Sequence, residues 1–268
     1  MVRSLRVKSY TGIYHVMLRG VNKQIIFEKS GDYIKFIDLL RQSVAPTDDL
    51  GKLLPPRCHF YAYCLMPNHV HLVVQEGNEN LSEIVRRIAT AYALYFNKKY
   101  ERCGHLFQDR FKSEPVNDEA YFITLLRYVH QNPVAGNLCQ RVEDYAWSSW
   151  REYSASQRTQ KGQAPLCPIC RVSSVLNRIQ FDELQKLVNE PLPKMAKVLD
   201  FDKRKGSVTD DDIAEFLTSN YGLRNPVDLQ LYDKERRNDI LSSCKSIGAT
   251  IRQLSRLTGF SERIIRNA

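Results

Sequence analysis

The chain has 268 residues, of which 43% are hydrophobic and 26% are charged, and its formal net charge is +9. This composition predicts a globular protein with one domain of about 150 residues and a smaller one. No apolar run approaches the roughly 18 residues of a membrane helix, so we expect no membrane partner and a cytoplasmic location. The basic charge favours nucleic acid as a partner and, with it, association with the nucleoid. The seven scattered cysteines predict free thiols.

The first part of the chain alternates between strand-like and helix-like patterns. Residues 14–19 alternate as a strand does. Apolar residues at three- and four-residue spacing then predict a helix from residue 30 to about residue 43. Residues 58–65 alternate again, and we expect them to form a hairpin with residues 69–75.

Residues 81–132 add two helices and a fourth strand to the predicted elements. Residues 81–100 form the longest helical pattern, and residues 111–116 are typical of a fourth strand. The next helix, residues 118–132, should end before Pro133. The order β-α-β-β-α-β-α predicts an α+β fold for residues 1–153, with a ferredoxin-like βαββαβ core and one extra helix. In that arrangement the helices cover one face of the sheet and leave the other available for a ligand.

The C-terminal part differs in composition. Residues 154–172 are polar with several prolines, and we interpret them as a linker before an all-helical domain over residues 173–268. Residues 250–266 have the pattern of two short helices around a turn, which predicts a helix-turn-helix-like end. Many small helical domains contain such a turn without binding DNA, but clustered arginines favour DNA binding here. The cluster consists of Arg252, Arg256, Arg263 and Arg266, and the first three are our candidates for DNA contact.

Two histidines follow a turn in the expected hairpin. Met66-Pro67-Asn68 is typical of a tight turn, because Pro restricts φ and Asn tolerates turn geometry. Since a strand has a period of two, His69 and His71 project from the same face, about 7 Å apart along the backbone. Two such imidazoles can bind one metal ion, although paired histidines in a strand are also common as half-buried polar residues. We place both on the open face of the sheet.

The helix over residues 118–132 carries a tyrosine and two amides near its apolar stripe. Tyr128 lies about 100° from the centre of that stripe, with Asn132 about 40° and Gln131 about 60° from Tyr128 on either side. A tyrosine at the edge of a buried stripe usually serves packing. Its closeness to an amide makes Tyr128 a candidate catalytic residue as well.

Four ordered motifs between residues 10 and 150 give the chain a resemblance to a known family. The chain resembles the single-tyrosine HUH transposases, particularly the branch called REP-associated tyrosine transposases and its bacterial relatives. The motifs are Tyr14-His15-Val16 with Arg19-Gly20 and Gln24-Ile25-Ile26-Phe27, and the segments 66–72, 107–113 and 127–134.

This resemblance implies the same βαββαβ core and a specific set of site residues. His69 and His71 would be the metal-binding pair and Tyr128 the nucleophile. An amide of the tyrosine helix would supply the third ligand, for which we expect Asn132, with Gln131 as the alternative. A site of two imidazoles and an amide suits Mg²⁺ or Mn²⁺ better than structural zinc.

The implied activity is nicking and rejoining of single-stranded DNA that carries a hairpin, through a 5′-phosphotyrosine bond. Basic residues would hold the DNA, and two tyrosines would be available for base stacking. Each of them could equally be a solvated charge or a core aromatic. The candidates in this part of the chain are Arg19, Lys23, Tyr61, Tyr63, Arg86, Arg110 and Lys112.

One departure from the family pattern and two alternative functions stay open. Relatives commonly carry a basic residue between the Asn-Pro-Val of the tyrosine helix and an Ala-Gly pair, whereas here Ala135-Gly136 follows at once. One alternative is a non-catalytic, sequence-specific DNA-binding regulator derived from a transposase. The other is a related HUH replication initiator or relaxase. The sequence leaves the oligomeric state open, with a homodimer as one option.

Overall fold

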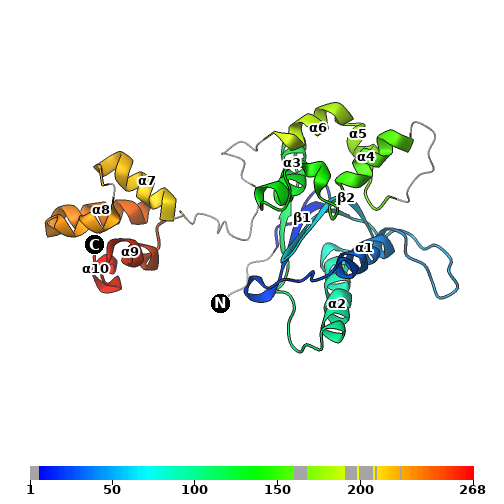
Figure 1. The fold of residues 1–268 in the computed structure, drawn as a ribbon, viewed down its shortest axis with the longest axis horizontal. Helices are drawn as coiled ribbons and strands as arrows, with labels where there is room; N and C mark the ends of the chain where they lie inside the picture. Colours follow the sequence, from blue (N-terminus) through cyan, green and yellow to red (C-terminus); the bar gives the residue numbers. More distant parts are fainter. Residues whose placement is uncertain (1–5, 160–167, 191–197, 199–207, 209, 224) are drawn as a thin grey trace. The chain divides into compact units, whose positions relative to one another are not determined.

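The computed structural model describes residues 6–159, 168–190, 198, 208, 210–223 and 225–268. The chain divides into two compact units, Met1–Leu199 and Asp200–Ala268 (Figure 1). In the described part of the chain, no helix is long and apolar enough to cross a membrane.

The larger unit is built on a four-stranded antiparallel sheet with the order β2-β3-β1-β4. The expected strands are all present, within one or two residues of the predicted ends. A bulge between Phe60 and Ala62 interrupts the register of the β2–β3 hairpin. The strands are β1 (Ile13–Arg19), β2 (Cys58–Met66), β3 (His69–Glu76) and β4 (Lys112–Pro115).

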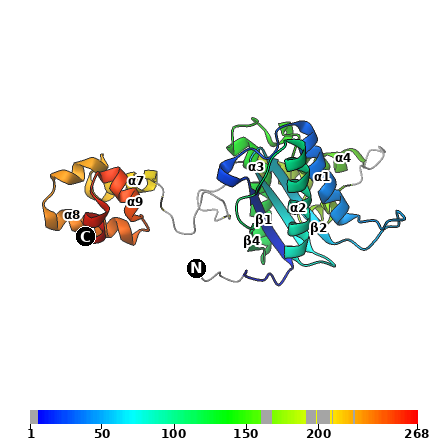
Figure 2. The same cartoon turned by 90° about the horizontal axis from the view of Figure 1, so that it is seen from below.

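Helices lie on both faces of this sheet (Figures 1 and 2). Helices α1 (Ser30–Val44) and α2 (Leu81–Lys99) cover one face, and α3 (Glu119–Ala135) covers the other. The prediction that helices leave the second face of the sheet open is therefore wrong. His71, which we placed on that face, is fully buried. The physical reason is the apolar stripe of α3, which has to be buried against the sheet.

Helix α3 continues past the residue at which we expected it to end. It runs to Ala135 and contains Pro133, so the predicted end at Asn132 is wrong. Pro133 is buried and continues the stripe that includes Val129. Proline removes one helical hydrogen bond, but here its ring packs in the core, and the backbone bond from Gly136 N to Asn132 O, 2.8 Å long, continues the helix beyond it.

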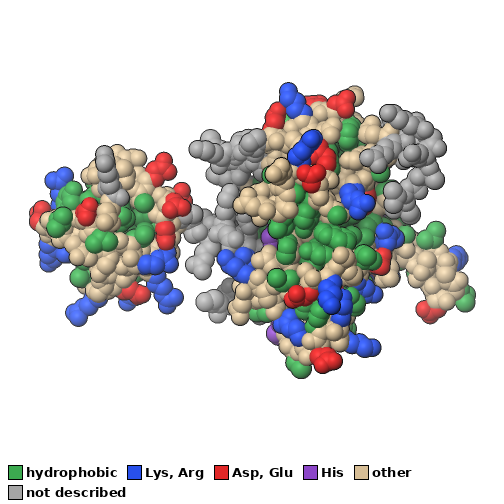
Figure 3. All heavy atoms as spheres, in the orientation of Figure 1, with side chains coloured by type: hydrophobic (Ala, Val, Ile, Leu, Met, Phe, Trp, Pro, Cys, Tyr) green, Lys and Arg blue, Asp and Glu red, His purple; other side chains and the backbone are tan. Residues whose placement is uncertain are grey.

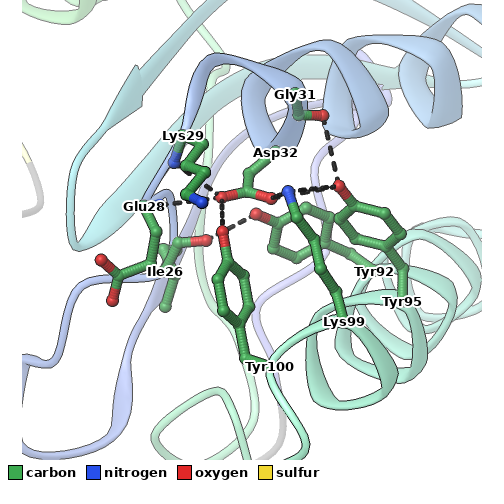
Figure 4. A network of polar contacts seen from close by, with 9 residues as sticks. All are labelled: Ile26, Glu28, Lys29, Gly31, Asp32, Tyr92, Tyr95, Lys99 and Tyr100. Atoms are coloured by element: carbon green, nitrogen blue, oxygen red, sulfur yellow. Dashed lines mark hydrogen bonds and ion pairs between the residues drawn. The ribbon is translucent and has the colours of Figure 1, made fainter.

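A buried carboxylate joins α1 to α2 (Figure 4). Asp32, with none of its surface exposed, accepts hydrogen bonds from Lys99 Nζ at 2.5 Å and from Tyr100 OH at 2.7 Å. It also accepts the backbone N–H groups of Glu28 and Lys29, at 2.9 and 2.8 Å. This network fixes the loop that leads from β1 into α1, which includes the short 3₁₀ helix η1 (Val21–Lys23).

The segment we expected to be a linker is largely part of the larger unit. Within that segment, Arg171 N donates to Phe60 O of the edge strand β2 at 2.8 Å. The boundary predicted at residue 173 is replaced by one at Leu199, because the flanking helices bury their apolar residues in the same core. Residues 160–167 lie outside the described residues. The flanking elements are η2 (Val142–Asp144), α4 (Trp150–Thr159), α5 (Val172–Leu176) and α6 (Phe181–Asn189).

The smaller unit is helical with a core of its own, which includes Leu217, Ile240 and Leu254. The two short helices expected near its end are present, and Gly259, with φ of 74°, forms the turn between them. Glycine suits this left-handed conformation because it has no Cβ. The elements are α7 (Asp210–Tyr221), η3 (Pro226–Leu231), α8 (Lys234–Ser246), α9 (Ile251–Thr258) and α10 (Glu262–Arg266).

Candidate functional site

Three histidines cluster on the sheet face beneath α3. Strands β1 and β3 are antiparallel neighbours, and Met17 pairs with His71 while Arg19 pairs with His69. Because side chains alternate along a strand, His15 lies on the same face as the other two histidines. His15 Nε2 is 3.0 Å from His71 Nδ1, and the two rings are stacked with centroids 5.3 Å apart.

His15 has a place in the site that the sequence analysis did not assign to it. The analysis included His15 only as part of a motif. The alternation of β1 places His15 and Arg19 on one face, which is a signal present in the sequence. The pairing of β1 with β3, however, joins segments more than fifty residues apart, and only the tertiary structure provides it.

His69 is the half-buried member of the cluster, beside the turn between β2 and β3. Its ring is 4.9 Å from that of His71 and nearly perpendicular to it, with an interplanar angle of 85°. Its Nδ1 is 2.6 Å from Asn68 Oδ1. The two histidines predicted as a metal-binding pair are therefore adjacent, with different degrees of burial.

Tyr128 on α3 lies over this cluster. Its ring centroid is 5.3 Å from that of His71 and 5.9 Å from that of His15, in edge-to-face arrangements. Tyr128 itself is half-buried. The structure thus brings the tyrosine together with the predicted histidine pair, although 57 residues separate it from His71 in sequence.

The two amides considered as a third ligand have different surroundings. Gln131 donates through Nε2 to the carbonyl oxygen of Val188 at 2.9 Å, and also contacts the carbonyl of Glu190. These bonds join α3 to the end of α6, and neither of them involves the histidine cluster. Asn132 Nδ2 donates to Tyr128 O at 2.7 Å, one helical turn back. Gln131 is thus bonded to backbone carbonyls at the end of α6, whereas the Asn132 amide is bonded within α3.

Burial favours the neutral form of His15 and His71, the two fully buried histidines of the cluster. Loss of solvation lowers the pKa of His15 to about 3. Burial, and then the nearby His15 and His69, lower the pKa of His71 well below its usual range. His71 Nε2 is buried and has no hydrogen-bond partner in the described part of the chain. A neutral imidazole nitrogen without such a partner is compatible with a metal ligand.

A metal here would need ligands other than acidic side chains and thiolates. Among the described residues, no group of three or more His, Cys, Asp and Glu side chains is arranged to hold a metal ion. Two imidazoles, an amide oxygen and water are a set that fits Mn²⁺ or Mg²⁺ rather than a closed zinc site.

His130, on the same helix as Tyr128, has a structural role. Its Nδ1 is 2.9 Å from the carbonyl oxygen of Leu126, and its Nε2 is 2.8 Å from Ser149 Oγ. Both ring nitrogens are thus engaged away from the site, in a fully buried position. This agrees with the helical geometry, which directs His130 away from Tyr128.

Two of the basic residues expected to bind DNA line one groove between α2 and residues 104–111. Arg86 and Arg110 lie there together with Arg6, and the groove has a volume of about 570 Å³. The Arg6 guanidinium carbon is 3.7 Å from the centre of the Phe111 ring, and its Nη1 donates to Ser82 Oγ at 2.8 Å. The sequence analysis did not select Arg6, which lies far from the groove's other residues in sequence.

The remaining basic candidates of this unit do not line that groove. Arg19 is only 8% exposed and shares the sheet face of the histidines. Lys23 and Lys112 are exposed. Figure 3 shows Lys and Arg side chains interspersed with Asp and Glu over the visible surface of each unit, so charge on that face does not mark a single binding patch.

The two tyrosines expected to stack on bases are buried, and this prediction is wrong. Tyr61 is 3% exposed and Tyr63 is 5% exposed. Tyr61 OH donates to Gln75 Oε1 at 2.8 Å, and Tyr63 OH donates to Glu152 Oε1 at 3.1 Å. They are inaccessible because α3 and α4 pack over this part of the sheet, which the sequence pattern of the strand alone could not show.

In the smaller unit, the arginines selected from the sequence are on the surface of α9 and α10. Arg256 forms an ion pair with Asp210, and Arg252 Nε lies 3.9 Å from Glu262 Oε1. Arg263 is also exposed. Exposed ion pairs of this kind contribute little to stability, so these side chains can exchange their partners.

Comparison with known proteins finds a similar family for the segment that carries this site. Residues 8–132 match the model of a family described as IS200-like transposases. The chain is similar to this family over that segment, which is just under half of its length and contains the histidine cluster, Tyr128 and Asn132.

Two further proteins are similar to parts of the chain. A protein of Haemophilus influenzae named as a putative REP-associated tyrosine transposase is 29% identical over 101 residues, which cover 33% of this chain. The chain spans 57% of the length of that curated relative. A solved structure of a REP-associated tyrosine transposase bound to a REP hairpin has 17% sequence identity and a TM-score of 0.46, covering 58% of this chain and 86% of that one.

Proposed function

We propose that this protein is a metal-dependent transposase that nicks and rejoins single-stranded DNA carrying a hairpin. The observation that carries the proposal is the position of the Tyr128 ring against His71, whose ring is in turn 4.9 Å from that of His69, within a segment that matches a transposase family. The proposed nucleophile and the two proposed histidine ligands would thereby act at one place, between α3 and the sheet.

The fold supports this proposal. The element order β-α-β-β-α-β with the sheet order β2-β3-β1-β4 is that expected of a ferredoxin-like core. In it, the central strands β1 and β3 carry the histidines, and the extra helix α3 carries the tyrosine. The two central strands and α3 would thus carry the proposed chemistry.

In the proposed reaction the Tyr128 oxygen attacks the phosphorus of a DNA phosphodiester. The bond from phosphorus to the 3′ oxygen breaks, the 3′ oxygen leaves as a hydroxyl after taking a proton from water, and the tyrosine proton passes to solvent. The product is a 5′-phosphotyrosine ester. A second 3′-hydroxyl then attacks this ester, releases Tyr128 and joins the strands without ATP.

His69, His71 and Asn132 would hold the metal, Mg²⁺ or Mn²⁺. The bound ion would supply neutralisation of charge on the phosphate oxygens. His71, buried and neutral, would present an imidazole nitrogen at no cost of deprotonation. Asn132 would contribute its amide oxygen, since its amide nitrogen donates to Tyr128 O.

The groove beside α2 is our proposed site for single-stranded DNA. Arg6, Arg86 and Arg110 provide three positive charges against one acidic lining residue, Asp109. Aromatic rings at the same groove, including Phe111, could stack with unpaired bases. We further propose that Arg252, Arg256 and Arg263 of the smaller unit bind DNA, with Arg19, Lys23 and Lys112 as additional phosphate contacts in the larger one.

A covalent-trapping experiment tests the function. Purified protein is mixed with labelled single-stranded hairpin oligonucleotides and Mn²⁺ or Mg²⁺, and adducts are separated on a denaturing gel. We expect an adduct that chelation and Tyr128→Phe both abolish. Tyr121→Phe, on the same helix, is the matched control and should retain the adduct.

The same experiment separates the alternatives. Tight, metal-independent binding without any adduct, even with hairpins from DNA flanking the gene, would favour a non-catalytic regulator. An adduct formed on hairpin-free origin sequences would favour a replication initiator or relaxase.

A further inference from the structure

We propose that Asn68 is a positioning residue that holds His69 in one tautomer. The proposal rests on the function proposed above, in which His69 binds a metal. Asn68 is the last residue of the turn between β2 and β3, and His69 is the first residue of β3. Their side chains meet at 2.6 Å, between Asn68 Oδ1 and His69 Nδ1.

The second bond of the amide determines the direction of the first. Asn68 Nδ2 lies 3.3 Å from the carbonyl oxygen of Lys23, which can only accept a hydrogen bond. The NH₂ group must therefore face Lys23, and the amide oxygen must face His69. Because an amide oxygen can only accept, His69 Nδ1 has to carry the proton.

This tautomer has a direct consequence for metal binding. When Nδ1 of a neutral imidazole carries the proton, Nε2 carries the lone pair. His69 would thus present Nε2 to a metal, while Asn68 restrains the rotation of its ring. Metal-binding histidines in general are oriented in this way by an acceptor for the second ring nitrogen.

The backbone around Asn68 keeps both of its partners in place. Gly20 N donates to Asn68 O at 2.9 Å, and Ile26 N donates to Pro67 O at 2.8 Å. The loop of residues 20–27 is therefore bonded to the turn on both sides of Lys23. The Lys23 carbonyl, which orients the Asn68 amide, therefore lies in a loop whose backbone is hydrogen-bonded to the turn.

Nitrogen-15 NMR of the metal-free protein tests the inference without any need for activity. With histidine labelled at both ring nitrogens and the sample at about pH 8, above the ordinary histidine pKa, two-bond proton–nitrogen correlations identify the tautomer. We expect His69 in the Nδ1–H form. Asn68→Ala should shift it toward the Nε2–H form, whereas Asn68→Asp, which keeps an acceptor oxygen, should retain Nδ1–H.

Asn78→Ala is the matched control, because Asn78 is an exposed asparagine near the other end of β3. It should leave the His69 signals unchanged. The amide spectrum of each variant reports whether the sheet is intact. An Nε2–H form in the unmodified protein, or an unchanged tautomer in folded Asn68→Ala, would overturn the inference.

Calorimetric titration with Mn²⁺ measures the consequence. We expect Asn68→Ala to weaken Mn²⁺ binding about tenfold, the lower end of the effect of removing such an orienting partner, and Asn68→Asp to stay within about threefold of the unmodified protein. Equal affinities for the unmodified protein and folded Asn68→Ala would contradict the orienting role. If the unmodified protein binds no Mn²⁺, the proposed metal function fails, while the tautomer measurement still decides the role of Asn68.

Discussion

His15 Nε2 and His71 Nδ1 lie 3.0 Å apart, and neither side chain has any exposed surface. One of the two nitrogens must donate to the other. If His71 is to offer Nε2 to a metal, its Nδ1 carries the proton and donates to His15. His15 would then orient His71 as Asn68 orients His69.

The first prediction concerns this pair. His15→Phe keeps a planar ring but removes the acceptor, so we expect Mn²⁺ affinity to fall about tenfold. His15→Gln, whose side-chain oxygen can accept the same bond, should restore part of the affinity. Calorimetric titration measures both variants, and thermal unfolding shows whether they are folded. Unchanged affinity in folded His15→Phe would exclude an orienting role for His15.

The second prediction concerns the groove beside α2. Arg110→Ala should weaken binding of a labelled hairpin oligonucleotide with a single-stranded flank. If Arg110 contacts one phosphate of that flank, the slope of log affinity against log salt should decrease by about 0.7. Fluorescence anisotropy over a range of salt concentrations provides the slope. Arg141→Ala, at a residue that is 68% exposed and outside the groove, is the control. Equal slopes for the two variants would argue against the groove as a DNA site.

The third prediction concerns the stability of the Asp32 network. Asp32→Asn puts an NH₂ group against hydrogen-bond donors, so we expect the free energy of unfolding to fall by about 2 kcal/mol. Asp38→Asn removes an exposed carboxylate of the same helix and should change it by no more than about 0.5 kcal/mol. Urea unfolding at neutral pH measures both. Similar losses of unfolding free energy in the two variants would show that the buried Asp32 carboxylate contributes no more to stability than the exposed Asp38 carboxylate.

Asp32 also predicts a pH dependence. Burial alone would raise its pKa, but hydrogen bonds from Lys99, Tyr100, Lys29 and Tyr95 outweigh burial and lower it below the ordinary value of 3.8. The contribution of the Asp32 carboxylate to stability is therefore present above pH 3.8, and it is lost as the pH falls through the pKa of Asp32 in the folded protein. Urea unfolding between neutral and acidic pH should show a smaller loss of stability for Asp32→Asn than for the unmodified protein. An identical acid dependence would contradict this assignment.

The fourth prediction concerns the loop that holds the Asn68 turn. A Cβ added at Gly20 would lie 2.3 Å from Gln24 O and 2.9 Å from Ile26 Cγ2, so the loop has to move. We expect Gly20→Ala to reduce the free energy of unfolding by roughly 2 kcal/mol and to weaken Mn²⁺ binding as well. In Gly31→Ala, the added carbon would meet only Lys99 Nζ at 3.8 Å, and this helical position should tolerate it. Urea unfolding and calorimetry compare the two, and equal behaviour would refute the steric argument.

Local patterns in the sequence were sufficient for the order of the elements and for the local spacing of the candidate site residues. The alternation of β3 placed His69 and His71 on one face, and helical periodicity placed Tyr128 near Asn132. These relationships depend on the geometry of a single strand or helix, which repeats every two or 3.6 residues whatever packs against it. The strand bounds agree with the structure within one or two residues for the same reason, whereas the end of α3 does not.

Tertiary structure alone decided which of these residues are accessible and which meet. It placed His15 against His71, buried Tyr61 and Tyr63, and kept Pro133 within α3. It also assigned residues after 153 to the core of the larger unit. These outcomes depend on contacts between segments far apart in the chain. Burial of an apolar stripe outweighs the local preferences of a proline or a polar segment. The free energy gained by removing the apolar area of the whole stripe from water is larger than the free-energy cost of any single unfavourable residue.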